Sequence, residues 1–214
     1  MKSEKLLIIG DSYSTFEGYI PEGYAVYYDK AETRPGTGVR SVEDTWWHIF
    51  SRETGMEIIE NNSWSGSTVC YTGRGGDCSR SSSFIYRLRC LCDSDFRGKG
   101  APDTLIIFGA TNDSWIDAPL GEAKLSGFEE SDLYSVLPAV ADIIYEAKAA
   151  LHKTRIVYVI NTGLKPEISA HVKAASERYG TEYVELSNID KVSGHPTALG
   201  MRQIADQVKA RFAK

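Results

Sequence analysis

Long hydrophobic runs are missing from this sequence. The apolar stretch Leu6–Ile9 is too short to be the hydrophobic region of a secretory signal. No stretch approaches the roughly 20 apolar residues that a membrane-spanning helix needs. The sequence therefore predicts a cytoplasmic protein with no membrane span. A mature form whose signal has been removed also fits the sequence.

Runs of like charge are missing as well. The 24 Lys and Arg residues against 29 Asp and Glu residues give a formal net charge of −5. This weak acidity argues against nucleic acid or an anionic membrane as the main partner. Neither the G-x-G-x-x-G pattern nor the P-loop pattern occurs. The sequence therefore gives no support for a nucleotide-binding site.

Cysteine is scarce, with only four residues, and they fit no zinc-binding pattern. A single residue separates Cys90 from Cys92, where zinc motifs have at least two, and no histidine lies near them. We predict buried or half-buried free thiols. A disulfide between Cys70 and Cys78 is the alternative.

The 214 residues suit one domain, 1–214, with a substantial core. Apolar runs predict strands, and helical periodicity predicts helices between them. Pro138 predicts a kink or a late start in one of these helices. Alternation of this kind implies a parallel sheet covered on both faces. The expected strands are Lys5–Ile9, Met56–Asn61, Thr104–Gly109, Thr154–Asn161 and Glu182–Leu186, and the expected helices are Val42–Thr54, Ser81–Asp93, Ser131–His152, Pro166–Tyr179 and Pro196–Phe212.

Four polar positions follow strands of this predicted sheet. Ser12 follows the first strand in Gly-Asp-Ser, Gly66 follows the second, and Asn112 follows the third. His195 lies before the last helix, where Pro196 suits the first helical turn. Each residue alone is typical of an ordinary turn or cap. Together they supply the nucleophile, the base and the oxyanion donors that ester cleavage needs.

The same four residues carry a family resemblance. The sequence resembles the SGNH (GDSL-like) hydrolase superfamily, whose marker residues Ser, Gly, Asn and His match Ser12, Gly66, Asn112 and His195 in order. The resemblance covers nearly the whole chain, from Leu6 to about Phe212. It implies a flavodoxin-like three-layer α/β/α sandwich. Its five-stranded parallel sheet would have strand order 2-1-3-4-5.

The resemblance also implies a mechanism. Ser12 attacks an ester carbonyl as His195 takes its proton, and an acyl-enzyme forms. The N–H groups of Ser12 and Gly66 and the side-chain amide of Asn112 hold the oxyanion. No metal or cofactor is needed. The expected substrate is a small-molecule or glycan ester with a short acyl chain, such as acetyl. The alternatives are a lysophospholipase or thioesterase, and a non-catalytic flavodoxin-like ligand-binding module.

One position departs from the family pattern. Val192 stands where the family carries an aspartate, three residues before His195, and the nearest acid is Asp190. Either Asp190 reaches Nδ1 of the histidine, or a backbone carbonyl near Val192 orients the ring in a Ser–His dyad. We favour the carbonyl because a shift of two residues changes the loop geometry substantially.

The loops expected around the site are rich in aromatic residues. Such rings either stack on the faces of sugars or pack the loops against one another. They are Tyr13, Tyr19, Tyr24, Tyr27, Tyr28, Trp64, Tyr71 and Trp115.

Overall fold

Five apolar strands pair in parallel to form the central sheet of the computed structural model, which describes residues 3–213. The strands are β1 (Lys5–Gly10), β2 (Glu57–Ser63), β5 (Thr104–Gly109), β6 (Arg155–Ile160) and β7 (Glu182–Glu185). Their order across the sheet is β2-β1-β5-β6-β7. Counting only these strands in chain order gives 2-1-3-4-5, so the predicted topology is confirmed.

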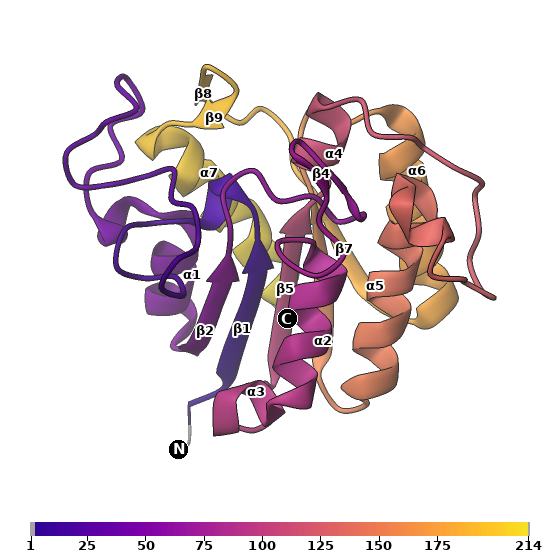
Figure 1. Ribbon diagram of the computed structural model, residues 1–214. Coiled ribbons are helices and arrows are strands. Elements are labelled where there is room, and N and C mark those ends of the chain that lie inside the picture. The colour runs from indigo at the N-terminus through magenta and orange to yellow at the C-terminus, as the bar shows by residue number, and fades with distance from the viewer. Residues whose placement is uncertain (1–2, 214) are drawn as a thin grey trace.

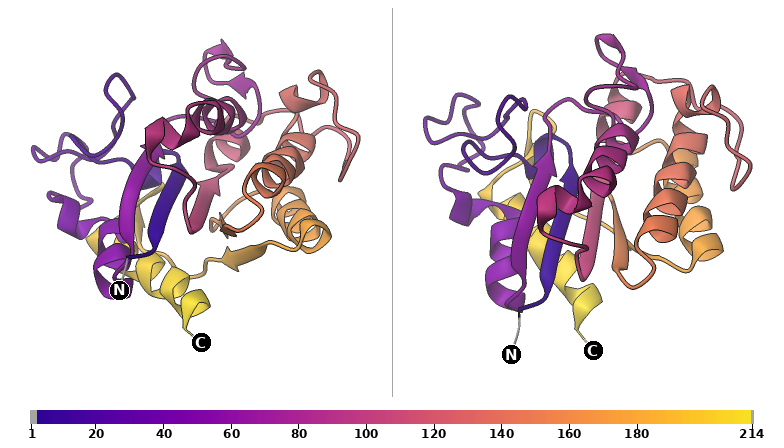
Figure 2. Two further views of the ribbon diagram at one scale, coloured as in Figure 1. Left: turned by 90° about the horizontal axis from the view of Figure 1, so that it is seen from below. Right: turned by 60° about the horizontal axis from the view of Figure 1, so that its bottom comes forward.

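Side chains alternate between two apolar layers along each central strand, because successive residues of a strand face opposite sides. In β1, Leu6 and Ile8 join one core, and Leu7 and Ile9 join the other. Both faces are covered, which explains why the strands read as continuous hydrophobic runs. Figures 1 and 2 show α1 and α7 on one face of the sheet and α2, α5 and α6 on the other. These helices are α1 (Trp46–Thr54), α2 (Phe84–Asp93), α5 (Val136–Ala150), α6 (Pro166–Tyr179) and α7 (Ala198–Phe212).

The remaining elements are short. Two further helices are α3 (Asp95–Gly98) and α4 (Thr111–Trp115). Four two-residue strands form two small antiparallel ribbons outside the main sheet. One ribbon pairs β3 (Thr72–Gly73) with β4 (Gly76–Asp77), and the other pairs β8 (Lys191–Val192) with β9 (His195–Pro196).

The first two helices of the main layers start later than the sequence predicts. The segment expected to be helical from Val42 begins with a 3₁₀ turn, and α1 starts only at Trp46. The turn closes because the backbone N–H of Ser41 donates to the carboxylate of Asp44, 3.0 Å away. Likewise, α2 starts at Phe84 and not at Ser81, because the Ser83 hydroxyl caps the helix by accepting from the N–H of Tyr86.

The starts of α5 and α7 also depend on residues near their first turns. α5 begins at Val136, so Pro138 lies in its first turn, which is the late start that this proline predicts. The prediction that Pro196 opens the last helix is wrong. Pro196 belongs to the ribbon strand β9, and α7 begins at Ala198. The hydroxyl of Thr197 provides its cap by accepting from the N–H of Gly200 at 3.1 Å.

All four cysteines are free thiols, so the alternative of a Cys70–Cys78 disulfide is wrong. Cys70 and Cys78 are buried and Cys92 is half-buried, as predicted, but Cys90 is exposed. Among residues 3–213, no helix is both long enough and apolar enough to cross a membrane.

Candidate active site

The candidate site lies at the carboxyl edge of the sheet. Ser12, Gly66 and Asn112 follow β1, β2 and β5, three neighbouring strands that run in the same direction. Parallel strands end at one edge, so the loops that follow them meet there. The β8–β9 ribbon carries His195 back over this edge (Figure 1).

The Ser12 hydroxyl and the His195 ring meet across 183 residues of sequence. Oγ of Ser12 lies 2.9 Å from Nε2 of His195, and both residues are buried. Ser12 opens a short 3₁₀ turn that begins where β1 ends. Gly10 permits this sharp exit because a Cβ at this position would lie 2.6 Å from the hydroxyl of Ser63 and 2.7 Å from Ser14.

The other nitrogen of His195 faces a backbone carbonyl. Nδ1 lies 3.3 Å from the carbonyl oxygen of Ser193. The carboxylate of Asp190 points elsewhere and accepts from the hydroxyl of Thr197, the cap of α7. Of the two orienters left open by the sequence, the geometry matches the backbone carbonyl near Val192, which is that of the adjacent Ser193.

Three candidate hydrogen-bond donors lie in the segments that follow β1, β2 and β5. Within residues 3–213, the backbone N–H groups of Ser12 and Gly66 donate to no other backbone group. Gly66 has a φ of +83°, a left-handed conformation that glycine adopts without strain. Nδ2 of Asn112 donates one of its two hydrogens to the carbonyl of Ser67 at 2.9 Å. This bond ties Asn112 to the loop that contains Gly66 and leaves the second hydrogen of the amide available.

Arg87 on α2 links the two loops that carry these donors. Its guanidinium donates to the Gly10 carbonyl at 3.1 Å, to the Ser67 hydroxyl at 3.1 Å and to the side-chain oxygen of Asn62 at 3.0 Å. It is almost fully buried, and burial lowers its pKa to about 10. We did not predict this role. The available signal is an arginine on the apolar face of a helix, three residues after Phe84 and four before Leu91.

Two buried carboxyl groups support the same edge. Burial raises the pKa of Asp11 to about 7, opposed by the Tyr13 N–H that donates to it at 3.0 Å. Burial also raises the pKa of Asp113, which accepts from the backbone N–H groups of Val69 and Cys70 at 3.0 Å. These carboxyl groups therefore fix loop backbones. Across the described part of the chain, no cluster of three His, Cys, Asp or Glu side chains is placed to hold a metal ion.

The imidazole of His195 is held in its neutral form. Burial lowers its pKa to about 4, and the nearby cations Arg34 and Lys191 act in the same direction, while the Ser193 carbonyl opposes them. A neutral ring with its proton on Nδ1 presents the lone pair of Nε2 to the Ser12 hydroxyl. The arrangement can therefore accept a proton from Ser12 at neutral pH.

Comparison with known families finds a match over nearly the whole chain. The model of the GDSL-like lipase/acylhydrolase family matches residues 4–212. The chain belongs to this family. Membership identifies it as a hydrolase of the GDSL-like lipase/esterase group and confirms the resemblance seen in the sequence. No curated protein matches the sequence.

Solved structures of other proteins have a similar fold. A protein described as a GDSL-like lipase from Bacteroides ovatus is 40% identical, with a TM-score of 0.88 and 99% of each chain covered. A second, from Bacteroides uniformis, is 36% identical with a TM-score of 0.87, covering 98% of this chain and 95% of that one. An acetyl xylan esterase from Butyrivibrio proteoclasticus is 14% identical, with a TM-score of 0.61 over 99% of this chain and 64% of that one. The last similarity shows the fold alone.

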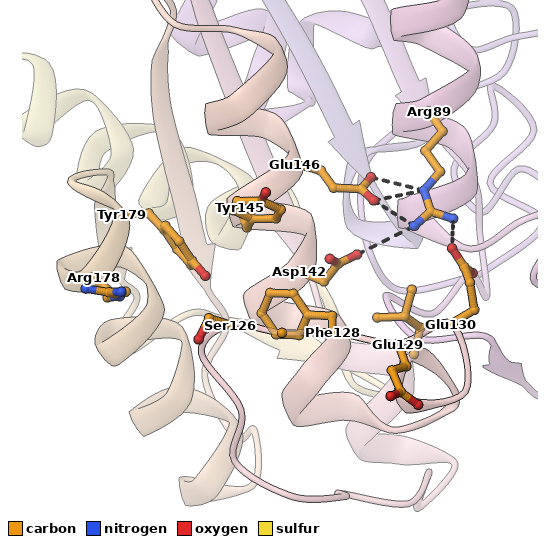
Figure 3. A pocket seen from close by; sticks show the side chains of 12 residues that line it. Arg89, Ser126, Phe128, Glu129, Glu130, Asp142, Tyr145, Glu146, Arg178 and Tyr179 are labelled. Carbon is orange, nitrogen blue, oxygen red and sulfur yellow. Dashed lines mark hydrogen bonds and ion pairs between the residues drawn. The ribbon is translucent and has the colours of Figure 1, made fainter.

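A separate cavity of about 500 Å³ lies between α2, α5 and α6, and it shares no residue with the candidate site of this GDSL-like protein (Figure 3). Arg89 of α2 lines this cavity and donates to Glu146 at 2.6 Å and to Glu130 at 2.8 Å. Nη2 of Arg89 also lies 3.8 Å from the buried carboxyl of Asp142, whose pKa burial raises to about 7. This network joins α2 to α5 and to the loop before it.

Proposed function

We propose that this GDSL-like protein is a serine esterase in which Ser12 is the nucleophile and His195 the general base. The observation that carries the proposal is the 2.9 Å contact between Oγ of Ser12 and Nε2 of His195. A nucleophilic serine needs an adjacent base that is itself oriented by a third group. The carbonyl of Ser193 is such a group.

The chemistry follows from these positions. The Ser12 hydroxyl gives its proton to Nε2 of His195 while Oγ bonds to the ester carbonyl carbon. The resulting oxyanion accepts from the N–H groups of Ser12 and Gly66 and from the free hydrogen of the Asn112 amide. The intermediate collapses, and the leaving alcohol takes the proton from His195. Water, deprotonated by the same ring, then releases the acid and restores Ser12.

The substrate that we propose is a short-chain ester, such as an acetyl ester, with carbohydrate as one class of alcohol. Ser12 and His195 are only 2% and 8% exposed, and this burial supports a small acyl group over a long one. Trp115, which is 43% exposed, borders His195 and offers an aromatic face at the rim. Sharing the fold of an acetyl xylan esterase is compatible with such a substrate.

A chain-length series tests this assignment. With p-nitrophenyl esters from acetate to decanoate, we expect kcat/KM to be highest for acetate and to fall as the acyl chain grows. Acetylated xylan should release acetate. A maximum at long chains would contradict the short-chain proposal and favour a lysophospholipase. Binding without any turnover would favour a ligand-binding module.

Removing the amide of Asn112 should mainly lower kcat. The loss of one oxyanion donor typically costs about 10²- to 10³-fold in kcat. We therefore expect Asn112→Ala to lose about this much in p-nitrophenyl acetate hydrolysis, with KM little changed. Thermal unfolding of the variant controls for loss of its bond to Ser67. If KM rose while kcat held, Asn112 would be a contact to the ground-state substrate.

Removing the charge of Asp190 should cost little. Its carboxylate accepts a hydrogen bond from the Thr197 hydroxyl and has none to His195. Asparagine keeps a side-chain oxygen that can accept the same bond. We expect Asp190→Asn to retain kcat within about threefold. A true triad acid behaves differently, because its replacement by asparagine lowers kcat by about 10⁴-fold. A loss above about 10³-fold in a folded variant would overturn the Ser–His dyad.

A further inference from the structure

His195 lacks the partner that usually stabilises a catalytic imidazole. No carboxylate contacts the ring among the described residues, and the Ser193 carbonyl lies 3.3 Å from Nδ1, at the long end for a hydrogen bond. The ribbon that carries the ring consists of two strands of two residues each. The Ser193 carbonyl therefore needs a second contact beside it to hold the plane of the imidazole during catalysis.

Aromatic rings surround the imidazole. The ring of Tyr27 stacks on His195 with a centroid separation of 3.5 Å and an angle of 10° between the planes. Trp115 meets the ring at 5.3 Å and 68°, and Tyr13 lies 5.5 Å away at 37°. Only Tyr27 is parallel to the imidazole and in contact with its face. It therefore restricts rotation of the ring in a way that an edge contact does not.

Two tyrosine hydroxyls hold the backbone on either side of His195. Tyr13 donates to the carbonyl of Gly194, and Tyr28 donates to the carbonyl of Pro196 at 2.9 Å. Both tyrosines are buried. Tyr13 also follows Ser12 directly in the chain, so the turn that presents the nucleophile also anchors the loop of the base.

The charges around His195 oppose its protonation. Arg34 and Lys191 are the charged side chains that act on the ring, and both are cations. The Arg34 guanidinium lies 5.5 Å from the Tyr27 centroid, and Nζ of Lys191 lies 5.2 Å from the Tyr13 centroid. Besides the Ser193 carbonyl, the π face of Tyr27 attracts an imidazolium, because the face of an aromatic ring is negative.

We propose that Tyr27 is a positioning residue that replaces the missing triad acid. Its stacked ring fixes the plane of His195, and its π face stabilises the imidazolium that forms when Ser12 transfers its proton. This inference rests on the proposed function of the Ser12–His195 pair. The side chains facing the ring are then Ser12 at Nε2, Tyr27 on one face and Trp115, Tyr13 and Tyr28 around it.

Three variants separate stacking from other roles. Tyr27→Phe and Tyr27→Trp keep an aromatic face, and Tyr27→Leu keeps apolar bulk without one. We expect the aromatic variants to retain kcat within about threefold. Tyr27→Leu should lose about 10- to 30-fold in kcat with KM nearly unchanged, the size that a desolvated cation–π contact implies. Tyr27→Met serves as the second non-aromatic variant if the leucine variant does not fold.

A second readout is independent of turnover. In a Ser12→Ala background, NMR titration of His195 should give a lower pKa with Leu at position 27 than with Tyr or Phe, because the leucine covers the ring without attracting its charge. Equal pKa values and equal kcat for the leucine and phenylalanine variants would overturn the inference while leaving the esterase intact. A rise in KM alone would also overturn it, because Tyr27 would then be a substrate platform. Full activity of Ser12→Ala would instead refute the proposed function.

Discussion

Replacing Ser12 with alanine is expected to lower the kcat for p-nitrophenyl acetate by about 10⁴- to 10⁶-fold, since removing the nucleophile of a serine hydrolase has an effect of this size. No covalent bond can form to the acyl carbon without Oγ. The fold should survive, because within residues 3–213 the serine hydroxyl hydrogen-bonds only to Nε2 of His195, and its loss leaves the 3₁₀ turn intact. The unfolding midpoint should therefore stay close to that of the unmodified protein.

The neighbouring Ser14 provides a matched control. It lies two residues further along the same turn and is buried, but its hydroxyl accepts from the indole N–H of Trp46 at 3.1 Å and does not face His195. Ser14→Ala should lower stability and retain kcat within about tenfold. Loss of activity in Ser14→Ala together with normal turnover in Ser12→Ala would show that the wrong serine has been assigned.

Replacing His195 with alanine should have an effect of similar size, because the serine hydroxyl then has no base. Groups that act as one unit are strongly non-additive. The double variant Ser12→Ala, His195→Ala should therefore be no slower than either single variant. An additive loss in the double variant would show that the two residues act independently, contrary to the 2.9 Å contact between them.

The pH dependence provides a second check on His195. Its pKa is lowered to about 4, mainly by burial, and the neutral ring is the active form. Activity is thus retained as pH falls through 6.5, the ordinary pKa of histidine, and is lost only as pH falls through about 4. A profile of kcat/KM against pH, measured in buffers of constant ionic strength, gives the pH at which activity falls on the acid side. An acid limb near 6.5 would mean that the ring is solvated in the free enzyme.

The strands and helices of this fold can be predicted from the sequence, because the patterns that indicate them lie within short segments. Continuous apolar runs mark buried parallel strands, and their order follows from the family pattern. The contact of Ser12 with His195 joins residues 183 apart, and it could be predicted from the family resemblance and because strand ends of a parallel sheet converge. The sequence predicts too early a start for α7, because Pro196 suits a first helical turn, while Thr197 provides the cap that the helix uses.

What the sequence did not predict depends on long-range packing. Strands of two residues, such as β8 and β9, carry no periodicity. Loop aromatics allow both stacking on a substrate and packing, and only the fold shows that Tyr27 covers His195 while Tyr24 covers Trp64. The buried role of Arg87 likewise depends on carbonyls from two distant loops.

Labelling with a fluorophosphonate followed by peptide mapping tests the central claim most directly. The reagent bonds to a serine only where a base activates it, so the reaction reports the nucleophile without any assumption about the natural substrate. We expect one modification per chain, located on Ser12, and none in the His195→Ala variant. Modification of another serine, or an unmodified Ser12 in protein that still hydrolyses esters, would contradict the account.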